Sequence, residues 1–449
     1  MASETRTIRI EALARVEGEG ALDIRLEGDR IEELKLRIYE PPRFFEAFLC
    51  GRPLEEVPDI TARICGICPV AYMMTSVHAL EAALGVTIPP EIRQLRRLLY
   101  CGEWIESHAL HMHLLHAPDF LGYDSGLEMA RDYPTELGRG LRLKKHGNQL
   151  LETLGGRAIH PINVAVGGFY RCPKRDELAA LVPDFEWGVQ AAAETTRWIA
   201  GFPYPHFERP YEMIALSHPD EYPMNEGRIV STSGLSLPAS DFETEFEEIH
   251  VPHSTALHAA RRRDGSSYLV GPLARVTLNR DRLSPTARRV ADEIAFEPSC
   301  RNPYKSLIAR GLELIHAYEE ALQILTNYAP PRTSRVTYKP HAGEGAAATE
   351  APRGMLYHRY RIDEQGKIEF ATIVPPTSQN QRQIEEDLRH LIPTILAETD
   401  DNLGRQCERL VRSYDPCISC STHFLKIHID RGERSLDPIT SPSNVTPTP

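Results

Sequence analysis

Two pairs of cysteines near opposite ends of the chain constrain its fold more than any other feature. Cys65 and Cys68 form one CxxC motif, and Cys417 and Cys420 form the other. Within each motif the cysteines are three residues apart, so one turn can direct both sulfurs toward a single point. Four converging sulfurs make a soft metal site. If they converge, the fold must bring together segments that are 349 residues apart in sequence.

Two other kinds of site also use such cysteine pairs. Four cysteines can hold a structural zinc ion, but zinc ribbons separate their pairs by roughly 15–20 residues. A dithiol/disulfide pair is the second alternative, but neither motif lies in the βαβ pattern of thioredoxin-like proteins. Gly66 permits a tight turn in the first motif, and Pro416 predicts an extended Asp415 before the second. The cysteine pairs alone leave zinc, a redox pair and a catalytic metal open.

Charge and composition argue against several classes of protein. The 449 residues carry a formal net charge of −12, whereas binding to nucleic acid or to anionic membranes favours a basic face. No run of 18 apolar residues predicts a membrane span, and the polar start of the chain lacks the apolar core of a secretory signal. The nine cysteines are an odd number, which argues against a disulfide framework. We therefore expect a cytoplasmic protein that binds no nucleic acid.

Residue periodicity predicts a mainly α-helical chain with a small N-terminal antiparallel sheet and further short strands, an α+β fold. Alternating apolar and polar residues over 6–39 indicate the sheet. The other elements expected are helices over 70–84, 91–116, 176–200, 304–328 and 384–403, strands within 227–280, a hairpin over 356–373, and a Gly- and Ala-rich loop over 337–352. Because no repeat or linker is evident, we expect one domain over 1–449. Its low-complexity end, 435–449, is predicted to be disordered.

Six motifs, in order along the chain, resemble those of the large, catalytic subunit of nickel–iron hydrogenases. They are ARVEGEG at 14–20, RFFEAFLCGR at 43–52, RICGICPVA at 63–71, ATEAPRG at 348–354, VPPTSQNQ at 374–381 and DPCISCSTH at 415–423. Six ordered motifs are far more specific than either CxxC pair. The resemblance implies the hydrogenase large-subunit fold and the reversible heterolytic cleavage of H2 to protons and electrons.

The resemblance also implies a set of metal ligands. Cys65 and Cys417 would be terminal ligands of nickel, whereas Cys68 and Cys420 would bridge nickel to an iron that carries cyanide and carbon monoxide. Thiolate is a soft ligand that suits nickel. A terminal thiolate keeps enough basicity to accept a proton, because a bridging sulfur shares its electrons with two metals.

A magnesium-like ion and a processed C-terminus are implied in the same way. Glu46 and His423 match ligands of the ion, with a backbone carbonyl near Thr372 as a third, and oxygen-rich octahedral coordination suits magnesium. The family matures by proteolysis after the last motif. Here that cleavage would follow His423 and release the 26 residues Phe424–Pro449, a possible cleaved or disordered extension over 424–449. A permanent tail is the alternative.

Three residues match the family's catalytic groups around the metals. Arg353 corresponds to an arginine poised over the metals that polarises or deprotonates H2, and Asp415 to the carboxylate that holds it. Glu17 corresponds to a glutamate that bonds the terminal thiolate and passes protons outward, a task that suits a carboxyl group of raised pKa. The structural alternatives are a surface arginine, a helix N-cap and a solvated glutamate.

Three further residues are expected near the metal ligands. Thr377 would hydrogen-bond a cyanide, and Pro352 belongs to the same segment as Arg353. Two positions depart from the family pattern. Pro376 stands where many relatives have Ser or Thr, and Tyr72 stands where many have a histidine that contacts a bridging sulfur. Because tyrosine can still donate one hydrogen bond, we expect Tyr72 to tune the site.

Electron transfer requires partners, because the other five cysteines lack iron–sulfur spacing. The motifs are most similar to those of the cytosolic branch coupled to NAD(P), or sulfhydrogenase-like branch. This implies an iron–sulfur small subunit, a flavin/NAD(P) diaphorase with additional iron–sulfur subunits, a maturation protease and nickel-insertion factors. No GxGxxG motif follows a predicted strand, so the nicotinamide would bind a partner. The alternatives are coupling to the deazaflavin F420 or another carrier, a non-catalytic scaffold subunit, and a structural zinc protein.

Overall fold

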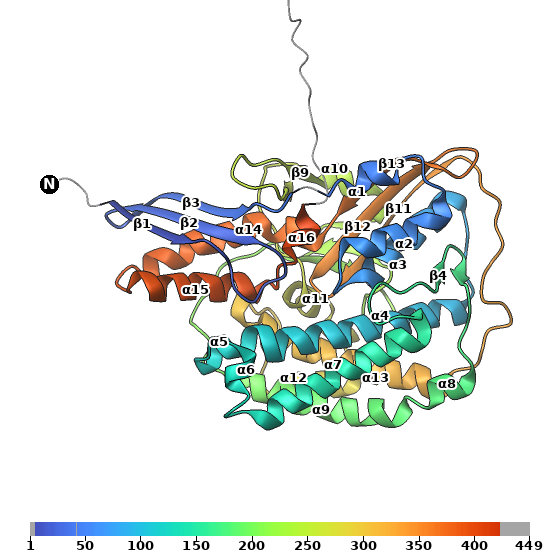
Figure 1. Ribbon diagram of the computed structural model, residues 1–449, viewed down its shortest axis with the longest axis horizontal. Coiled ribbons are helices and arrows are strands. Elements are labelled where there is room, and N and C mark those ends of the chain that lie inside the picture. Colours follow the sequence, from blue (N-terminus) through green and yellow to red (C-terminus); the bar gives the residue numbers. More distant parts are fainter. Residues whose placement is uncertain (1–4, 42, 423–449) are drawn as a thin grey trace, which may run out of the picture.

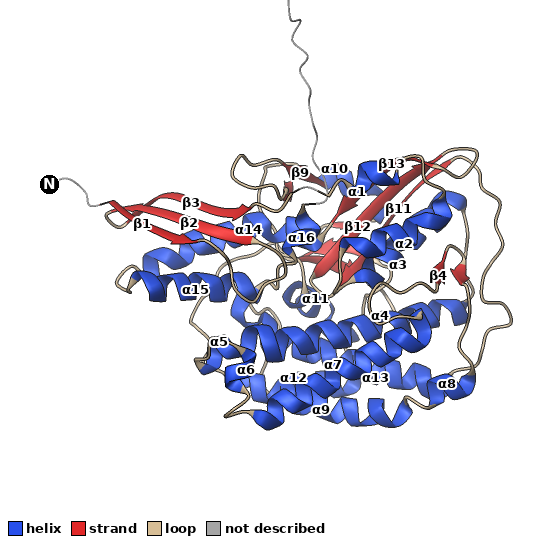
Figure 2. Cartoon of the chain, in the orientation of Figure 1, coloured by secondary structure: helices blue, strands red, loops and turns tan. Residues whose placement is uncertain are grey.

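The computed structural model of the chain describes residues 5–41 and 43–422. Long helices gather on one side of the molecule and most strands on the other (Figures 1 and 2). The long helices of the bundle are α4 (Pro90–Leu110), α7 (Pro134–Gly155), α9 (Val182–Ala200) and α13 (Ser306–Asn327). Helices α4 and α7 pack closely because Gly147 faces α4, where a Cβ would lie 2.7 Å from the carbonyl oxygen of Gly102.

The predicted N-terminal sheet is present. It comprises β1 (Thr5–Ile10), β2 (Gly20–Glu27) and β3 (Arg30–Ile38) in antiparallel order. Alternate residues of β2, Leu22, Ile24 and Leu26, are buried, as a period of two predicts. Helix α14 (Pro376–Leu391) packs on β3 and α15 (Asp400–Ser413) on β1, so late segments of the chain cover this early sheet.

A second antiparallel sheet contains β11 (Gly343–Ala351), β12 (Gly354–Ile362) and β13 (Ile368–Val374). The predicted hairpin over 356–373 is confirmed as β12–β13, but the loop predicted over 337–352 is wrong, because most of it is β11. Helix α3 (Pro69–Leu84) packs on β11 and β12. A Cβ at Gly345 would lie 2.3 Å from the carbonyl oxygen of Ala79, so close packing of α3 explains the small residues.

Several helix boundaries differ from the prediction. The helix expected over 384–403 is wrong: α14 ends at Leu391, a stretch containing Pro393 follows, and α15 begins after Thr399, whose side chain accepts a hydrogen bond from the N–H of Asn402. The helix expected over 176–200 is divided into α8 (Arg175–Ala179) and α9. Helix α7 was not predicted, because glycines occupy core positions on its buried face.

The remaining elements are short. They are α1 (Phe45–Leu49), α2 (Val57–Thr61), α5 (Ala117–Leu121), α6 (Gly126–Met129), α10 (Phe242–Glu245), α11 (Pro272–Asn279), α12 (Pro285–Glu293), α16 (Ile418–Ser421), β4 (Val164–Ala165), β5 (Gly168–Phe169), β6 (Ile214–Ser217), β7 (Arg228–Ser231), β8 (Ser236–Leu237), β9 (Phe246–Ile249) and β10 (His258–Arg261). Within the described ranges, no helix combines the length and the apolar character needed to cross a membrane. The predicted class, mainly helical with small antiparallel sheets, is confirmed.

Candidate metal centre

Four cysteine sulfurs from the two distant motifs meet in the interior. Cys65 Sγ lies 2.9 Å from Cys68 Sγ and 3.5 Å from Cys417 Sγ, and Cys417 Sγ lies 2.7 Å from Cys420 Sγ. All four sulfurs lie within 4.8 Å of one another, and none of the four residues is more than 4% exposed. The two CxxC motifs therefore converge, as the sequence predicts.

This donor set fits a soft transition metal. Cys65 Sγ accepts the N–H groups of Ile67 and Cys68, at 3.3 and 3.2 Å, which favours its thiolate form. Burial raises the pKa of Cys417 and of Cys420, and four neighbouring thiolates repel one another. A bound cation offsets both the effect of burial and the repulsion between thiolates, because metal coordination deprotonates thiols and neutralises their charge.

Helix termini place the cysteines of both motifs. Cys68 is the N-cap of α3, and Cys417 is the N-cap of α16, which contains Cys420. The buried carboxylate of Glu103, on α4, accepts the N–H groups of Val70 and Ala71 at 2.6 and 3.1 Å. It thereby caps the helix that carries the first motif. Sequence reasoning missed Glu103, because a glutamate in a predicted helix gives no signal of its own.

Glu17 lies at the sulfur of Cys417, where the resemblance places it. The thiol of Cys417 donates to Glu17 Oε2 at 3.0 Å, and the same oxygen accepts the N–H of Ser419 at 3.1 Å. The N–H of Ile418 donates to the carbonyl oxygen of Glu17 at 2.9 Å, within a parallel bridge between the two segments. Backbone pairing between the two ends of the described chain thus fixes the carboxylate beside the sulfur.

Arg353 is buried and held by Asp415. Its Nε donates to the carbonyl oxygen of Asp415 at 2.7 Å, and its Nη2 donates to Asp415 Oδ1 at 3.1 Å. Burial opposes the charged form, but the charges of Asp415 and the cysteines raise the pKa of Arg353 well above its usual value. Its Nη1 has no hydrogen-bond partner in the described part of the chain. A charged guanidinium with one unused nitrogen therefore lies near the sulfurs.

The backbone of Asp415 differs from the expectation. Its φ is 51°, in the left-handed region, although a residue before proline is expected to be extended. Its N–H donates to the carbonyl oxygen of Arg412 at 3.0 Å, which continues the turn at the end of α15. The N-cap of α16 is Cys417 rather than Asp415. A strained backbone thus accompanies the contact with Arg353.

Thr377, Pro352 and Tyr72 are also buried. Thr377 Oγ1 accepts the N–H of Cys417 at 3.0 Å. The Tyr72 hydroxyl is buried and has no hydrogen-bond partner within 5–41 and 43–422. Burial, and then the charges of the cysteines, raise the pKa of Tyr72 well above 10, so the hydroxyl keeps its proton.

Glu46 lies close to the chain that leads to His423, which itself falls outside the described residues. Glu46 Oε1 accepts the N–H of Ile373 at 2.6 Å, and Glu46 lines the same cavity as Thr372. The carbonyl oxygen of Thr422 accepts the N–H of Arg43 at 2.8 Å, three residues before Glu46. The structure therefore brings together the segments to which the magnesium-like site is assigned.

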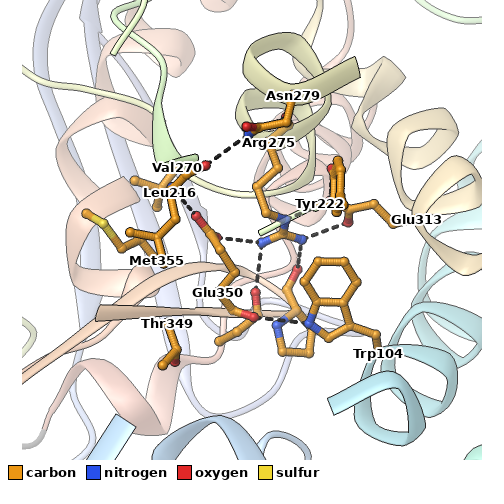
Figure 3. A network of polar contacts seen from close by, with 12 residues as sticks. Trp104, Leu216, Tyr222, Val270, Arg275, Asn279, Glu313, Thr349, Glu350 and Met355 are labelled. Carbon is orange, nitrogen blue, oxygen red and sulfur yellow. Dashed lines mark hydrogen bonds and ion pairs between the residues drawn. The ribbon is translucent and has the colours of Figure 1, made fainter. Parts of the chain in front are cut away.

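Arg275, on α11, holds the end of the strand that leads to Arg353 (Figure 3). Five hydrogen bonds of 2.6–3.0 Å join its guanidinium to the carboxylates of Glu313 and Glu350 and to the carbonyl oxygens of Ala351 and Pro352. The ring of Trp104 lies 4.5 Å below the guanidinium, and its Nε1 donates to the carbonyl oxygen of Glu350 at 3.0 Å. Arg275 thus positions the turn at Pro352, and sequence reasoning missed it.

Removing this guanidinium should destabilise the protein strongly. In Arg275→Met the carboxylates of Glu313 and Glu350, both fully buried, lose their cation. We expect the free energy of unfolding to fall by about 3–5 kcal/mol, measured by denaturant titration. The matched control is Arg157→Met, an exposed arginine, for which we expect a change below about 0.5 kcal/mol. Equal effects of the two substitutions would contradict this role of Arg275.

The two carboxylates beside Arg275 titrate differently. Burial raises the pKa of Glu350 to about 7. Burial also opposes ionisation of Glu313, but two bonds from Arg275 and one contact with His108 lower its pKa to about 2. Glu350 receives one hydrogen bond from Arg275, which does not offset the effect of burial on its pKa.

A pH dependence of stability follows from Glu350. Its pKa is higher in the folded protein than the usual 4.5, so its contribution is complete below pH 4.5 and is lost as pH rises through about 7, by about 3 kcal/mol in total. The uncharged Glu350→Gln variant should show a shallower decline in unfolding free energy between pH 5 and 7. Glu344→Gln, an exposed residue on the same strand, should keep the wild-type slope. An unchanged slope in Glu350→Gln would refute this assignment.

Comparison with known proteins assigns the chain to a family. The model of the family described as nickel-dependent hydrogenase matches residues 43–138 and 239–423. The chain belongs to the nickel-dependent hydrogenase family. This hydrogenase chain is 34% identical to the sulfhydrogenase 1 subunit alpha of Pyrococcus furiosus, over 94% of the chain and 98% of the relative.

More distant relatives give the same assignment. The hydrogenase chain is 27% identical to the NAD-reducing hydrogenase HoxS subunit beta of Cupriavidus necator, with coverage of 94% and 95%. A solved NAD+-reducing [NiFe]-hydrogenase superposes with a TM-score of 0.84 and 26% identity, with coverage of 94% of this chain and all of that one. The chain is the catalytic subunit of a nickel hydrogenase, an oxidoreductase acting on H2, which decides against the zinc-protein and scaffold alternatives.

Proposed function

We propose that this subunit cleaves H2 reversibly within a cytoplasmic complex that exchanges the electrons with NAD(P). The observation that carries the proposal is the set of four buried sulfurs within 4.8 Å, with Arg353 and Glu17 nearby. The NAD-reducing relatives support NAD(P) as the acceptor. Coupling to F420 or another carrier is the alternative.

The four cysteines would hold nickel and iron. In this proposal Cys65 and Cys417 would bind nickel alone, Cys68 and Cys420 would bind both nickel and iron, and cyanide and carbon monoxide would be the other ligands of iron. When bound, such a centre supplies the site at which H2 is split heterolytically and its electrons are taken up. The chain itself supplies burial, which keeps bulk water from the sulfurs.

Side chains around the sulfurs would transfer the proton and orient the groups of the site. Glu17 Oε2, bonded to Cys417 Sγ, is placed to take a proton from that sulfur and pass it outward, because Glu17 is half-buried and not sealed from solvent. Asp415 orients Arg353, whose unused Nη1 is available to polarise H2. Thr377 bonds the backbone of Cys417 and would also lie beside the iron ligands.

A magnesium-like ion at Glu46 and His423 would anchor the C-terminal segment. Support comes from the approach of Thr422 to Arg43, close to Glu46. Cleavage after His423 by a maturation protease, once insertion factors have loaded nickel, would complete the site. Mass spectrometry of the purified complex should then show a large subunit that ends at His423.

Electrons must leave through partners. The other five cysteines belong to none of the groups within 5–41 and 43–422 that could hold a metal. We therefore assign electron transfer to an iron–sulfur small subunit, and the exchange with NAD(P) to a flavin-containing diaphorase with further iron–sulfur subunits.

Spectroscopy and acceptor assays on the purified complex test the proposal. We expect equal amounts of nickel and iron in the large subunit after separation from its partners, infrared bands of bound cyanide and carbon monoxide, and H2-dependent reduction of NAD+ or NADP+. Absence of these bands from the mature protein would refute the iron assignment. Reduction of F420 with no reduction of either nicotinamide would refute the acceptor assignment.

A further inference from the structure

A second group of metal-binding side chains lies apart from the cysteines. It comprises His253, in the loop after β9, His258 at the start of β10, and Glu385 on α14. One ligand atom from each residue lies within 4.8 Å of the other two, and His253 Nε2 is 2.8 Å from Glu385 Oε1. These three residues come from separate segments, and the fold brings them together.

His258 is the most informative member of this group. The residue is 3% exposed, and its Nε2 is buried without a hydrogen-bond partner among the residues described. A buried polar atom without a partner destabilises the fold unless a ligand satisfies it. The carboxylate of Glu385 lies beside His253. A buried imidazole nitrogen without a hydrogen-bond partner is available as a metal ligand.

We propose that His253, His258 and Glu385 form a binding site for a divalent transition-metal ion, zinc above all. Two imidazoles and one carboxylate are a known three-residue set for zinc, which leaves a fourth position for water. With bonds of about 2.0–2.2 Å, tetrahedral zinc separates its ligand atoms by about 3.3–3.5 Å. The three ligand atoms here all lie within 4.8 Å of one another, and His253 Nε2 lies 2.8 Å from Glu385 Oε1, a range that includes that spacing.

The site is distinct from the cysteine centre. Glu385 lies eight residues after Thr377 on α14, which corresponds to about 12 Å along the helix. The N–H of Leu36, on β3, donates to Glu385 Oε1 at 2.9 Å and orients the carboxylate. The ion would therefore fasten α14, which carries Thr377, to β10 and to the loop after β9.

Metal binding to the mature hydrogenase complex tests the site. After removal of loosely bound metal with a chelator, equilibrium dialysis against zinc should show one site per large subunit that His258→Gln weakens by at least about 100-fold. Glu385→Gln should weaken it as well, and both variants should keep their nickel. The control is His250→Gln, an exposed histidine three residues before His253, which should bind zinc like the wild type. Zinc binding by His258→Gln with wild-type stoichiometry and affinity would overturn the proposal.

Cobalt provides a readout that needs no substitution. In the wild-type complex, Co²⁺ bound at this site should show visible d–d bands without a thiolate-to-cobalt charge-transfer band, because the ligands are nitrogen and oxygen. A charge-transfer band that accounts for all of the bound cobalt would place the ion on cysteine, and no binding at all would leave the site without an ion. Either result would overturn the proposal, even if the variants did not fold.

Discussion

Replacing Cys420 by alanine should reduce H2 oxidation to the assay background. Cys420 Sγ lies 2.7 Å from Cys417 Sγ in a cluster whose four sulfurs fall within 4.8 Å. Removing one sulfur deprives both metals of a shared ligand in the proposed centre, so the centre should not assemble. Nickel and iron in the purified large subunit should both fall, and the infrared bands of the diatomic ligands should disappear. H2-dependent dye reduction measures the activity without depending on the terminal acceptor.

A buried cysteine outside the cluster serves as the control. Cys407, on α15, is fully buried, and burial raises its pKa to about 12, so it behaves as an apolar core residue. Cys407→Ala should cost no more than a few kcal/mol of stability and should keep both metals and most activity. Normal turnover of Cys420→Ala would show that this sulfur is not a ligand.

Replacing Arg353 by lysine should lower kcat by about 100- to 1,000-fold while both metals stay bound. Lysine keeps the positive charge but lacks the planar fork that bonds the carbonyl and the carboxylate of Asp415 at once. The effect expected from losing one well-placed donor at a reacting centre is of this size. Since the four cysteines are unchanged, metal content and infrared bands should match the wild type.

Steady-state kinetics with H2 distinguish this role from a purely structural one. The loss should fall on kcat more than on the KM for H2, because Arg353 is assigned to the chemical step rather than to gas binding. Arg361→Lys, an exposed arginine on the same hairpin, should leave kcat within twofold of the wild type. Loss of nickel or iron from Arg353→Lys would assign the residue to assembly of the centre.

The sequence was most informative where side-chain chemistry is unusual. Two CxxC pairs, together with a motif containing Glu17, predicted the sulfurs that converge, and alternation over 6–39 predicted the N-terminal sheet. The stretch 337–352 was wrongly predicted as a loop because Gly345 is small to admit α3, and close packing against a distant helix leaves no periodic signal. For the same reason the glycine-containing core face of α7 was missed.

Sequence reasoning also missed buried polar side chains. Glu103 and Arg275 support the two segments that carry Cys68 and Arg353, but each lies in an ordinary helical pattern. Their importance arises from partners more than 30 residues away in the chain. The left-handed backbone of Asp415 opposes the local preference set by Pro416. Tertiary contacts stabilise this conformation. Such features depend on the whole fold and not on neighbours in sequence.

The meeting of two distant cysteine pairs has a consequence for synthesis on the ribosome. The segments that complete the sulfur cluster are 349 residues apart, and translation adds about 5–20 residues per second. Cys65 and Cys68 are therefore made roughly 20–70 seconds before the second pair. During that interval the nascent chain contains only two of the four cysteines of the cluster. A metal ion delivered then would find only half of its cysteine ligands, so the complete centre can assemble only after the second pair has been synthesised.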